Sequence, residues 1–281
     1  MGQLHWAEYA IEASLLGTFM VAACVAVAVF EHPASPVLRR FTSPLIRRAL
    51  IGTLMGLTAI ALIYSTPGQR SGAHMNPGTT LTFFFLGKVR PLDATFYIIA
   101  QFFGGFGGVL VARAALRRTV AHDKVRFAAT LPGSKGLRTA WIAEFTIAFL
   151  MMSMVLWSSN LASTAPYTGI FAGLMVATFI AIESPLSGMS MNPARSLGSA
   201  LHARAFRGLW IYFTAPPLAM LGAALLFTSI RGAGCVYCAK LEHPHDVVHA
   251  CIFNCRIEQM PGWGCDVTRS SHSGISALPA R

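Results

Sequence analysis

The sequence predicts an all-α membrane protein with six transmembrane helices and two re-entrant half-helices arranged as an inverted repeat. Three observations lead to this fold class: long apolar blocks, few charged residues, and a short motif that occurs twice. Of the 281 residues, 54% are hydrophobic and only 12% are charged, whereas a soluble domain usually carries about 25% charged residues. Most of this chain is therefore expected to lie in lipid.

Six apolar blocks are long enough to cross a bilayer, because a helix needs roughly 20 apolar residues to span a hydrocarbon core of ~30 Å. The blocks are continuous rather than alternating, which excludes the strands of a closed barrel. No Lys or Arg precedes the first block, which contains Glu8 and Glu12, so we do not expect a cleavable signal peptide. The predicted spans lie near residues 8–30, 45–65, 92–115, 138–158, 165–183 and 208–230.

Each half of the chain repeats one pattern of three spans and one short segment. The frame Ser-Gly-x-x-Met-Asn-Pro occurs at 71–77 and again at 187–193. The first span of each half also carries one acid among apolar residues, Glu12 or Glu144. With three spans per half, the second copy enters the membrane from the opposite side, so the repeats at about 8–115 and 138–230 are inverted.

Each Asn-Pro pair begins a helix that is too short to cross the membrane. Asn is a good N-cap, and Pro suits the first helical position because no N–H is needed there. A helix of about ten residues rises ~15 Å, half the hydrocarbon core. Two such helices entering from opposite faces would meet at the midplane, and the backbone before each cap must be buried or line a water-filled cavity.

These paired motifs resemble those of the aquaporins, the major intrinsic protein family, over about residues 8–230. The family's two Asn-Pro-Ala motifs and the arginine that follows the second appear here as Asn76-Pro77-Gly78 and Asn192-Pro193-Ala194-Arg195. The resemblance implies a passive channel for water, with glycerol, urea, peroxide and ammonia as further neutral solutes. It also implies that protons and ions are excluded by the facing helix N-termini and that the protein is not an enzyme.

The resemblance assigns roles to the residues around this channel. The asparagine amides would donate to a passing oxygen, and the carbonyls of 72–75 and 188–191 would accept from it. The narrow selectivity filter would be formed by Arg195, Met189, Thr178 in the fifth span, and Met55 or Gly56 in the second. Glu12, Glu144 and His74 would brace the re-entrant loops. The filter residues differ from those of both strict water channels and glycerol channels, so water is favoured and a broader range of solutes stays open.

The resemblance further implies a homotetramer in the cell membrane (plasma or inner) with both termini in the cytoplasm. The net charge of +11 indicates lipid headgroup contacts, not nucleic acid, because the basic residues lie in short loops between spans. Those loops include Arg39, Arg40, Arg117 and Arg118, which the family orientation would place outside, against the positive-inside rule. Glycine pairs at i, i+4, such as Gly104 and Gly108, predict close helix packing and suit a tetramer interface.

Residues 231–265 lie outside the resemblance and form a Cys/His-rich tail after a channel domain of residues 1–230. Two cysteine pairs with short spacing predict a zinc or iron site; a reactive or disulfide-bonded tail is the alternative. The candidate ligands are Cys235, Cys238, Cys251 and Cys255, with His243, His245 or His249 replacing one thiolate. Residues 266–281 are predicted to be disordered.

Two other classes of function compete with the channel. Inverted repeats with broken helices also build secondary transporters, which would need an ion-coupling acid; Glu12 and Glu144 are the candidates. A membrane-anchored thiol or metal sensor would depend on the tail instead of the pore. No enzyme is indicated, because the sequence shows neither a nucleophile–base pairing nor a phosphate-binding loop.

Overall fold

The computed structural model describes residues 3–243 and 251–262, so the predictions for His245, His249 and 266–281 fall outside the described residues. The described part is helical, and six helices are long and apolar enough to cross a membrane. These confirm the six predicted spans: α1 (Trp6–Glu31), α3 (Pro44–Tyr64), α6 (Pro91–Leu116), α8 (Leu137–Ser159), α9 (Thr168–Ile182) and α12 (Leu209–Arg231).

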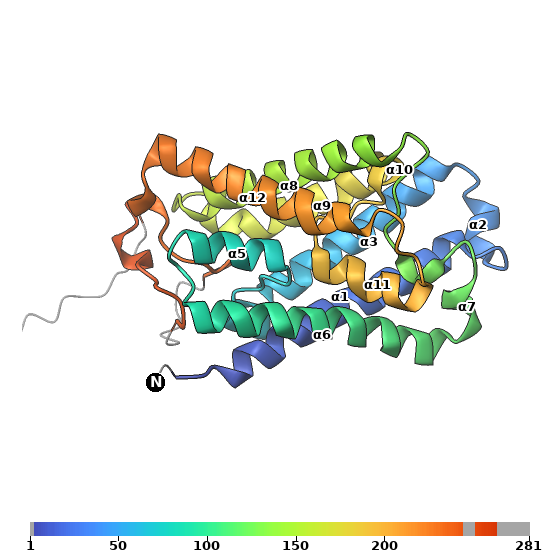
Figure 1. Ribbon diagram of the computed structural model, residues 1–281, viewed down its shortest axis with the longest axis horizontal. Helices are drawn as coiled ribbons and strands as arrows, with labels where there is room; N and C mark the ends of the chain where they lie inside the picture. The colour runs from blue at the N-terminus through green and yellow to red at the C-terminus, as the bar shows by residue number, and fades with distance from the viewer. Residues whose placement is uncertain (1–2, 244–250, 263–281) are drawn as a thin grey trace, which may run out of the picture.

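The two half-helices lie inside this bundle. Helix α5 (Pro77–Phe85) and helix α11 (Pro193–Ala203) begin near its middle and run toward opposite ends (Figure 1). Each is preceded by a short helix that ends at a left-handed glycine: α4 (Thr66–Ser71) at Gly72 and α10 (Ser184–Ser187) at Gly188. The remaining short elements are α2 (Pro36–Arg40), α7 (Arg118–Ala121), η1 (Arg126–Ala128), η2 (Ala165–Tyr167), η3 (Ala233–Cys235) and η4 (Ile257–Gln259).

Glycines allow the long helices to approach closely, as predicted. A Cβ built on Gly108 of α6 would lie 2.3 Å from the carbonyl oxygen of Gly17 in α1. A Cβ on Gly56 of α3 would lie 2.4 Å from that of Gly173 in α9. Such distances cannot be accommodated without separating the backbones. These glycine faces therefore pack against other helices of the same subunit. The prediction that they suit a tetramer interface was wrong.

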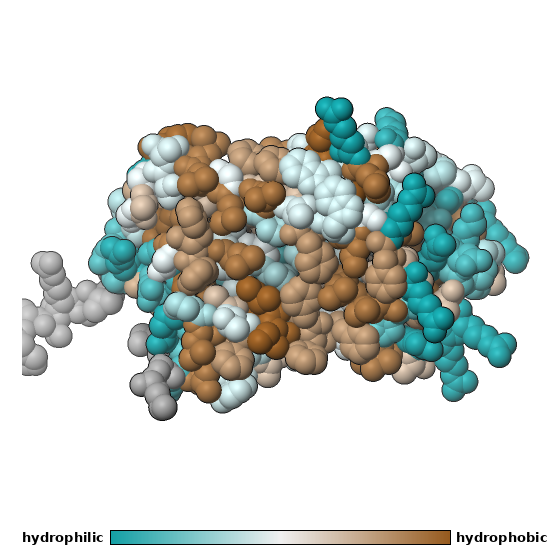
Figure 2. Space-filling model, viewed as in Figure 1, coloured by the Kyte–Doolittle hydropathy of each residue, from teal (hydrophilic) through white to brown (hydrophobic). Residues whose placement is uncertain are grey.

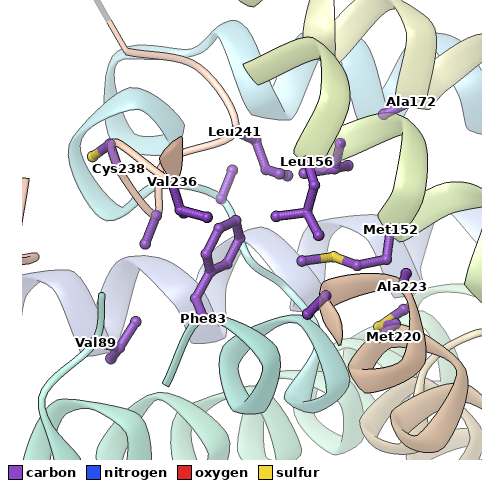
Figure 3. Close-up of a cluster of buried hydrophobic side chains, with 14 of the residues drawn as sticks. Phe83, Val89, Met152, Leu156, Ala172, Met220, Ala223, Val236, Cys238 and Leu241 are labelled. Carbon is purple, nitrogen blue, oxygen red and sulfur yellow. The ribbon is translucent and has the colours of Figure 1, made fainter. Parts of the chain in front are cut away.

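The tail packs on the end of the bundle that carries the N-terminus (Figure 1). Val236 and Leu241 are buried in the same apolar cluster as Phe83 of α5 and Leu156 of α8 (Figure 3). The tail thus shares the core of the channel domain. On the face shown in Figure 2, hydrophobic side chains cover the middle of the bundle, and hydrophilic side chains gather at the end formed by α2 and α7.

Candidate functional site

Two loops with unusual backbone conformation reach the middle of the bundle. In the first, Ala73 and Met75 have φ angles of 52° and 48°; in the second, Met189 and Met191 have 52° and 55°. A left-handed conformation at a non-glycine residue costs about 1–3 kcal/mol and persists only where the surroundings enforce it. The surroundings that enforce it are equivalent in the two halves of the chain.

A buried carboxylate holds each loop. Glu12 accepts hydrogen bonds from the backbone N–H groups of His74 (3.0 Å) and Met75 (2.7 Å). Glu144 accepts the equivalent bonds from Ser190 and Met191, both at 2.7 Å. Both carboxylates are 0% exposed. Their acceptor sites are directed at the loops, and neither residue lines the central cavity.

Serine and tyrosine side chains complete this support, and the sequence analysis did not identify them. Ser71 donates to Glu12 and Ser187 donates to Glu144. Tyr97 of α6 donates to the carbonyl oxygen of Ser71, and Tyr212 of α12 donates to that of Ser187. The serine that occurs in both copies of the Ser-Gly frame could have indicated this role, because a residue shared by both copies of an inverted repeat has an equivalent environment in each.

The two asparagines connect the halves at the centre. The Oδ1 atom of Asn76 caps α5 by accepting from Gly78 N–H at 2.8 Å, and that of Asn192 caps α11 by accepting from Ala194 N–H at 3.0 Å. Asn76 Nδ2 donates to the carbonyl oxygen of Met191, and Asn192 Nδ2 to that of Met75, both at 2.7 Å. A primary amide has two N–H groups. One is used in this crossed bond, which leaves the other for a solute in the cavity that both asparagines line.

A cavity of about 360 Å³ runs past these asparagines. Its wall is mainly apolar, with contributions from α1, α3, α8, α9 and α12 and from both loops. Arg195, in the first turn of α11, supplies a charge to this wall, and its buried Nη1 atom has no hydrogen-bond partner among the described residues. Buried donors are almost always paired, so a water or polar solute in the cavity is its natural acceptor.

The structure corrects one predicted filter residue. Thr178 is exposed on the outer face of α9, where its hydroxyl donates to the carbonyl oxygen of Leu174 at 2.9 Å. Val176 and Ile180 line the cavity instead. At 100° per residue, positions 176 and 180 share one face of a helix and 178 lies on the other. In the second span, Met55 lines the cavity, whereas Gly56 faces α9. Met189 also lies in the cavity wall.

The predicted series of acceptor carbonyls is partly occupied by protein donors. The carbonyl oxygen of Gly72 accepts from the N–H of Leu241 in the tail at 3.1 Å. Those of Met75 and Met191 accept the crossed asparagine amides described above. His74 also contacts the tail, because its Nε2 lies 2.8 Å from the carbonyl oxygen of Ala239, and its Nδ1 lies 3.0 Å from Thr80 Oγ1 in α5.

In the tail, four residues form a group that could hold a metal ion: Cys238, His243, Cys251 and Cys255. Their ligand atoms all lie within 4.8 Å of one another. Cys235 is not part of this group, so the group matches the predicted alternative in which a histidine replaces one of the four thiolates. Cys235 lies in the η3 turn that directly follows α12, before the tail reaches the position where the other ligands meet.

Two half-helices that meet cap to cap inside a six-helix bundle, with crossed asparagine amides and an arginine at the cavity wall, define an aquaporin-type channel. Comparison with known proteins places the chain itself: it belongs to the major intrinsic protein family, whose sequence profile, described as "Major intrinsic protein", matches residues 6–227. Members of this family are passive channels. The chain is therefore a multi-pass membrane channel for water and small solutes, and not an enzyme.

Plant proteins are among its relatives. Aquaporin NIP1-2 of Arabidopsis thaliana is 33% identical over 78% of this chain and 73% of its own length. Aquaporin NIP2-2 of Zea mays is 36% identical over 63% of this chain, and the match spans only 58% of the maize protein. The X-ray structure of the aquaglyceroporin from Plasmodium falciparum shares the fold, with a TM-score of 0.68 and 16% identity over 80% of this chain and 96% of that chain.

Proposed function

We propose that this channel conducts water and small neutral solutes passively and excludes protons and ions. The crossed asparagine pair is the observation that carries the proposal, because it puts two amide donors at the point where α5 and α11 begin. The positive ends of both helix dipoles converge there. A water oxygen that accepts from both asparagines sits in a positive potential, which opposes the passage of hydronium and other cations.

The filter in this proposal consists of Arg195, Met55, Met189 and Ile180, with Ile180 replacing Thr178. Three of its four members are apolar, so one fixed charge sets the polarity of the constriction. Such a wall favours small uncharged molecules without selecting strongly among them. Water is the favoured solute, and glycerol, urea, peroxide and ammonia remain candidates.

A secondary transporter is disfavoured by the hydrogen bonding of the two buried acids. Glu12 and Glu144 each accept two backbone N–H groups and a serine hydroxyl, and neither lines the cavity. An ion-coupling acid needs access to the permeation path. Conduction in this proposal requires no cofactor, and a zinc or iron ion is proposed for the tail alone.

The family suggests a homotetramer in the plasma or inner membrane with cytoplasmic termini. We adopt the oligomeric state, the membrane and the orientation as hypotheses. Chemical cross-linking in mild detergent should yield a four-subunit band. A monomeric protein that conducts fully would remove this part of the proposal.

Side-by-side measurement of water, glycerol, urea and peroxide permeability in proteoliposomes tests the function. We expect rapid flux driven by the solute or osmotic gradient alone. Flux that appears only with a gradient of H⁺ or Na⁺ would show a transporter instead. One set of these measurements should include a metal chelator, because the tail carries a candidate metal site.

A further inference from the structure

The tail reaches the wall of the cavity. Residues 236–242, here called the closing segment, have an irregular backbone with bends, and within them Ala239 is 0% and Leu241 8% exposed. Leu241 is one of the residues that line the cavity, and its side chain is directed toward Leu156 of α8 (Figure 3). Its N–H donates to the carbonyl oxygen of Gly72 in the first re-entrant loop. A solute moving along the cavity toward the end where α1 begins therefore meets Leu241.

The tail contacts the channel at several places, two of which lie beside the four-residue group. The first is the re-entrant loop, where Ala239 accepts from His74 and Phe253 stacks on the His74 ring at a centroid distance of 5.3 Å. The second is the turn after α5, where the N–H of Asn254 donates to the carbonyl oxygen of Lys88 (2.9 Å) and its side chain to that of Gly87 (2.7 Å). The 251–255 segment thus contacts both places, through Phe253 and Asn254, whereas the closing segment contacts the re-entrant loop through Ala239 and Leu241.

The four-residue group joins these two segments. Cys238 lies in the closing segment and His243 directly follows it, whereas Cys251 and Cys255 come from the 251–255 segment. The Sγ atoms of Cys238 and Cys251 are 3.7 Å apart, and Cys255 Sγ lies 3.5 Å from His243 Nε2. Around one tetrahedral Zn²⁺, with Zn–S of about 2.3 Å and Zn–N of about 2.0 Å, neighbouring ligand atoms are separated by roughly 3.5–3.8 Å. These two separations match a mononuclear site, and the other ligand atoms lie within 4.8 Å of one another. An iron–sulfur cluster would hold its thiolates further apart.

Two buried lysines beside the group provide an independent argument. Lys88 is 2% and Lys240 4% exposed, although lysine is almost never buried without a charged partner. Lys88 Nζ donates to the carbonyl oxygen of Asn254, the residue before Cys255, at 3.3 Å, and Lys240 lies in the sequence between Cys238 and His243. Three thiolates and one Zn²⁺ carry a net charge of −1, which would compensate such cations. Three neutral thiols would not.

We propose that Cys238, His243, Cys251 and Cys255 bind one Zn²⁺ ion, and that this ion fixes residues 236–242 in the channel mouth and restricts permeation. The zinc site is inferred from the tail alone, whereas the effect on permeation rests on the proposed channel function. Losing the ion removes the bonds that join the closing segment to Cys251 and Cys255. The closing segment then keeps its contacts with the re-entrant loop, with Asn160 and with Arg256, and the mouth opens more often.

The test uses the full chain, purified without an affinity tag and reconstituted into liposomes. Metal content is measured by elemental analysis, and water permeability by stopped-flow light scattering before and after chelation and after zinc is added back. The Cys251→Ser/Cys255→Ser double variant removes two ligands. The matched control is Cys235→Ser, which changes a tail cysteine outside the group. Leu241→Ser keeps all four ligands and weakens the closing contact.

We expect about one equivalent of zinc in the wild-type protein and in the Cys235→Ser and Leu241→Ser variants, and little in the double variant. Chelation should raise wild-type water permeability several-fold, and added zinc should reverse this. The double variant should conduct at the high level with or without zinc, and Leu241→Ser should conduct at an elevated level while zinc is bound.

Several results would overturn the proposal. Wild-type protein with less than about a tenth of an equivalent of zinc has no such site, and a Cys238–Cys251 disulfide found in its place has the same consequence. Zinc binding with unchanged permeability in every variant overturns the gate. If a folded double variant conducts no faster than empty liposomes, the channel function and the gate both fail, while the zinc content still reports on the metal site.

Discussion

Arg195 combines a fixed positive charge with a buried donor that has no protein partner among the described residues. We expect Arg195→Val to admit larger solutes and protons. A hydrogen bond to a charged group contributes about 1.5–3 kcal/mol, so the preference for water over glycerol should fall by on the order of tenfold. Stopped-flow permeability and a pH-sensitive dye in proteoliposomes measure this. Arg138→Val, at an exposed position in α8, is the control. Unchanged selectivity in a folded Arg195→Val protein would exclude Arg195 from the constriction.

Glu183, at the C-terminal end of α9, is a residue whose ionisation should affect stability. Burial, with a further contribution from the negative charge of Glu144, raises the pKa of Glu183 to about 7. The unfolded chain ionises near pH 4.5, so the folded state loses stability as the pH rises from about 4.5 to 7 and carries the full cost above that range. Glu183→Gln should therefore stabilise the protein at pH 8, by up to about 3 kcal/mol, and have little effect at pH 5.

Thermal unfolding in detergent at the two pH values tests this, with Asp123→Asn at an exposed loop position as the control. If Glu183→Gln raised the unfolding temperature equally at both pH values, the charge of Glu183 would not be the cause.

Single residues differ in how far the sequence predicts them. The asparagine caps follow from local chemistry, because each caps N–H groups within three positions of itself. Thr178 was misassigned because the rotation of α9 depends on helix packing, which the sequence of one span does not contain. Cys235 was preferred to His243 for a similar reason. The ligand set depends on where the tail docks, and its docking contacts join residues more than 160 positions apart.

At the level of helices, the spans were predictable because their length and apolar composition are dictated by the bilayer. Their packing partners were not, although the glycine spacing indicated which faces pack closely. The position of the two half-helices was predictable from the inverted repeat, since two half-helices with one motif restrict the fold far more than either alone.

Gly107 and Gly108 of α6 provide a matched test of this packing. A Cβ on Gly108 would lie 2.3 Å from the Gly17 carbonyl oxygen, whereas a Cβ on Gly107 has nothing within 4 Å. Gly108→Ala should destabilise the protein by about 1–3 kcal/mol through overpacking. Gly107→Ala should be neutral or stabilise it by up to about 1 kcal/mol, because alanine favours the helix. Denaturant unfolding in detergent compares the two, and equal effects would contradict the α1–α6 contact.

At the scale of the whole molecule, charge is distributed unevenly between the two ends of the bundle. Most of the basic residues lie at the end formed by α2 and α7 (Figure 2), and the start of α1 and the described part of the tail lie at the opposite end (Figure 1). The positive-inside rule would place the basic end in the cytoplasm, whereas the proposed orientation places the termini there. Cysteine ligands for zinc also favour a reducing compartment.

A fluorescent-protein fusion at the C-terminus and a phosphatase fusion at the same position distinguish these orientations in cells. We expect the fluorescent fusion to be active and the phosphatase fusion to be inactive. An active phosphatase would place the tail outside and would make the basic end cytoplasmic.

Passive conduction is the central claim, and stopped-flow shrinkage of proteoliposomes under an osmotic gradient tests it most directly. The full-length protein should be measured after chelation, with an internal pH-sensitive dye to follow protons at the same time. We predict shrinkage well above that of empty liposomes, without any ion gradient and without proton flux. Shrinkage no faster than that of empty liposomes, or a flux that requires H⁺ or Na⁺, would contradict a passive channel built around Asn76, Asn192 and Arg195.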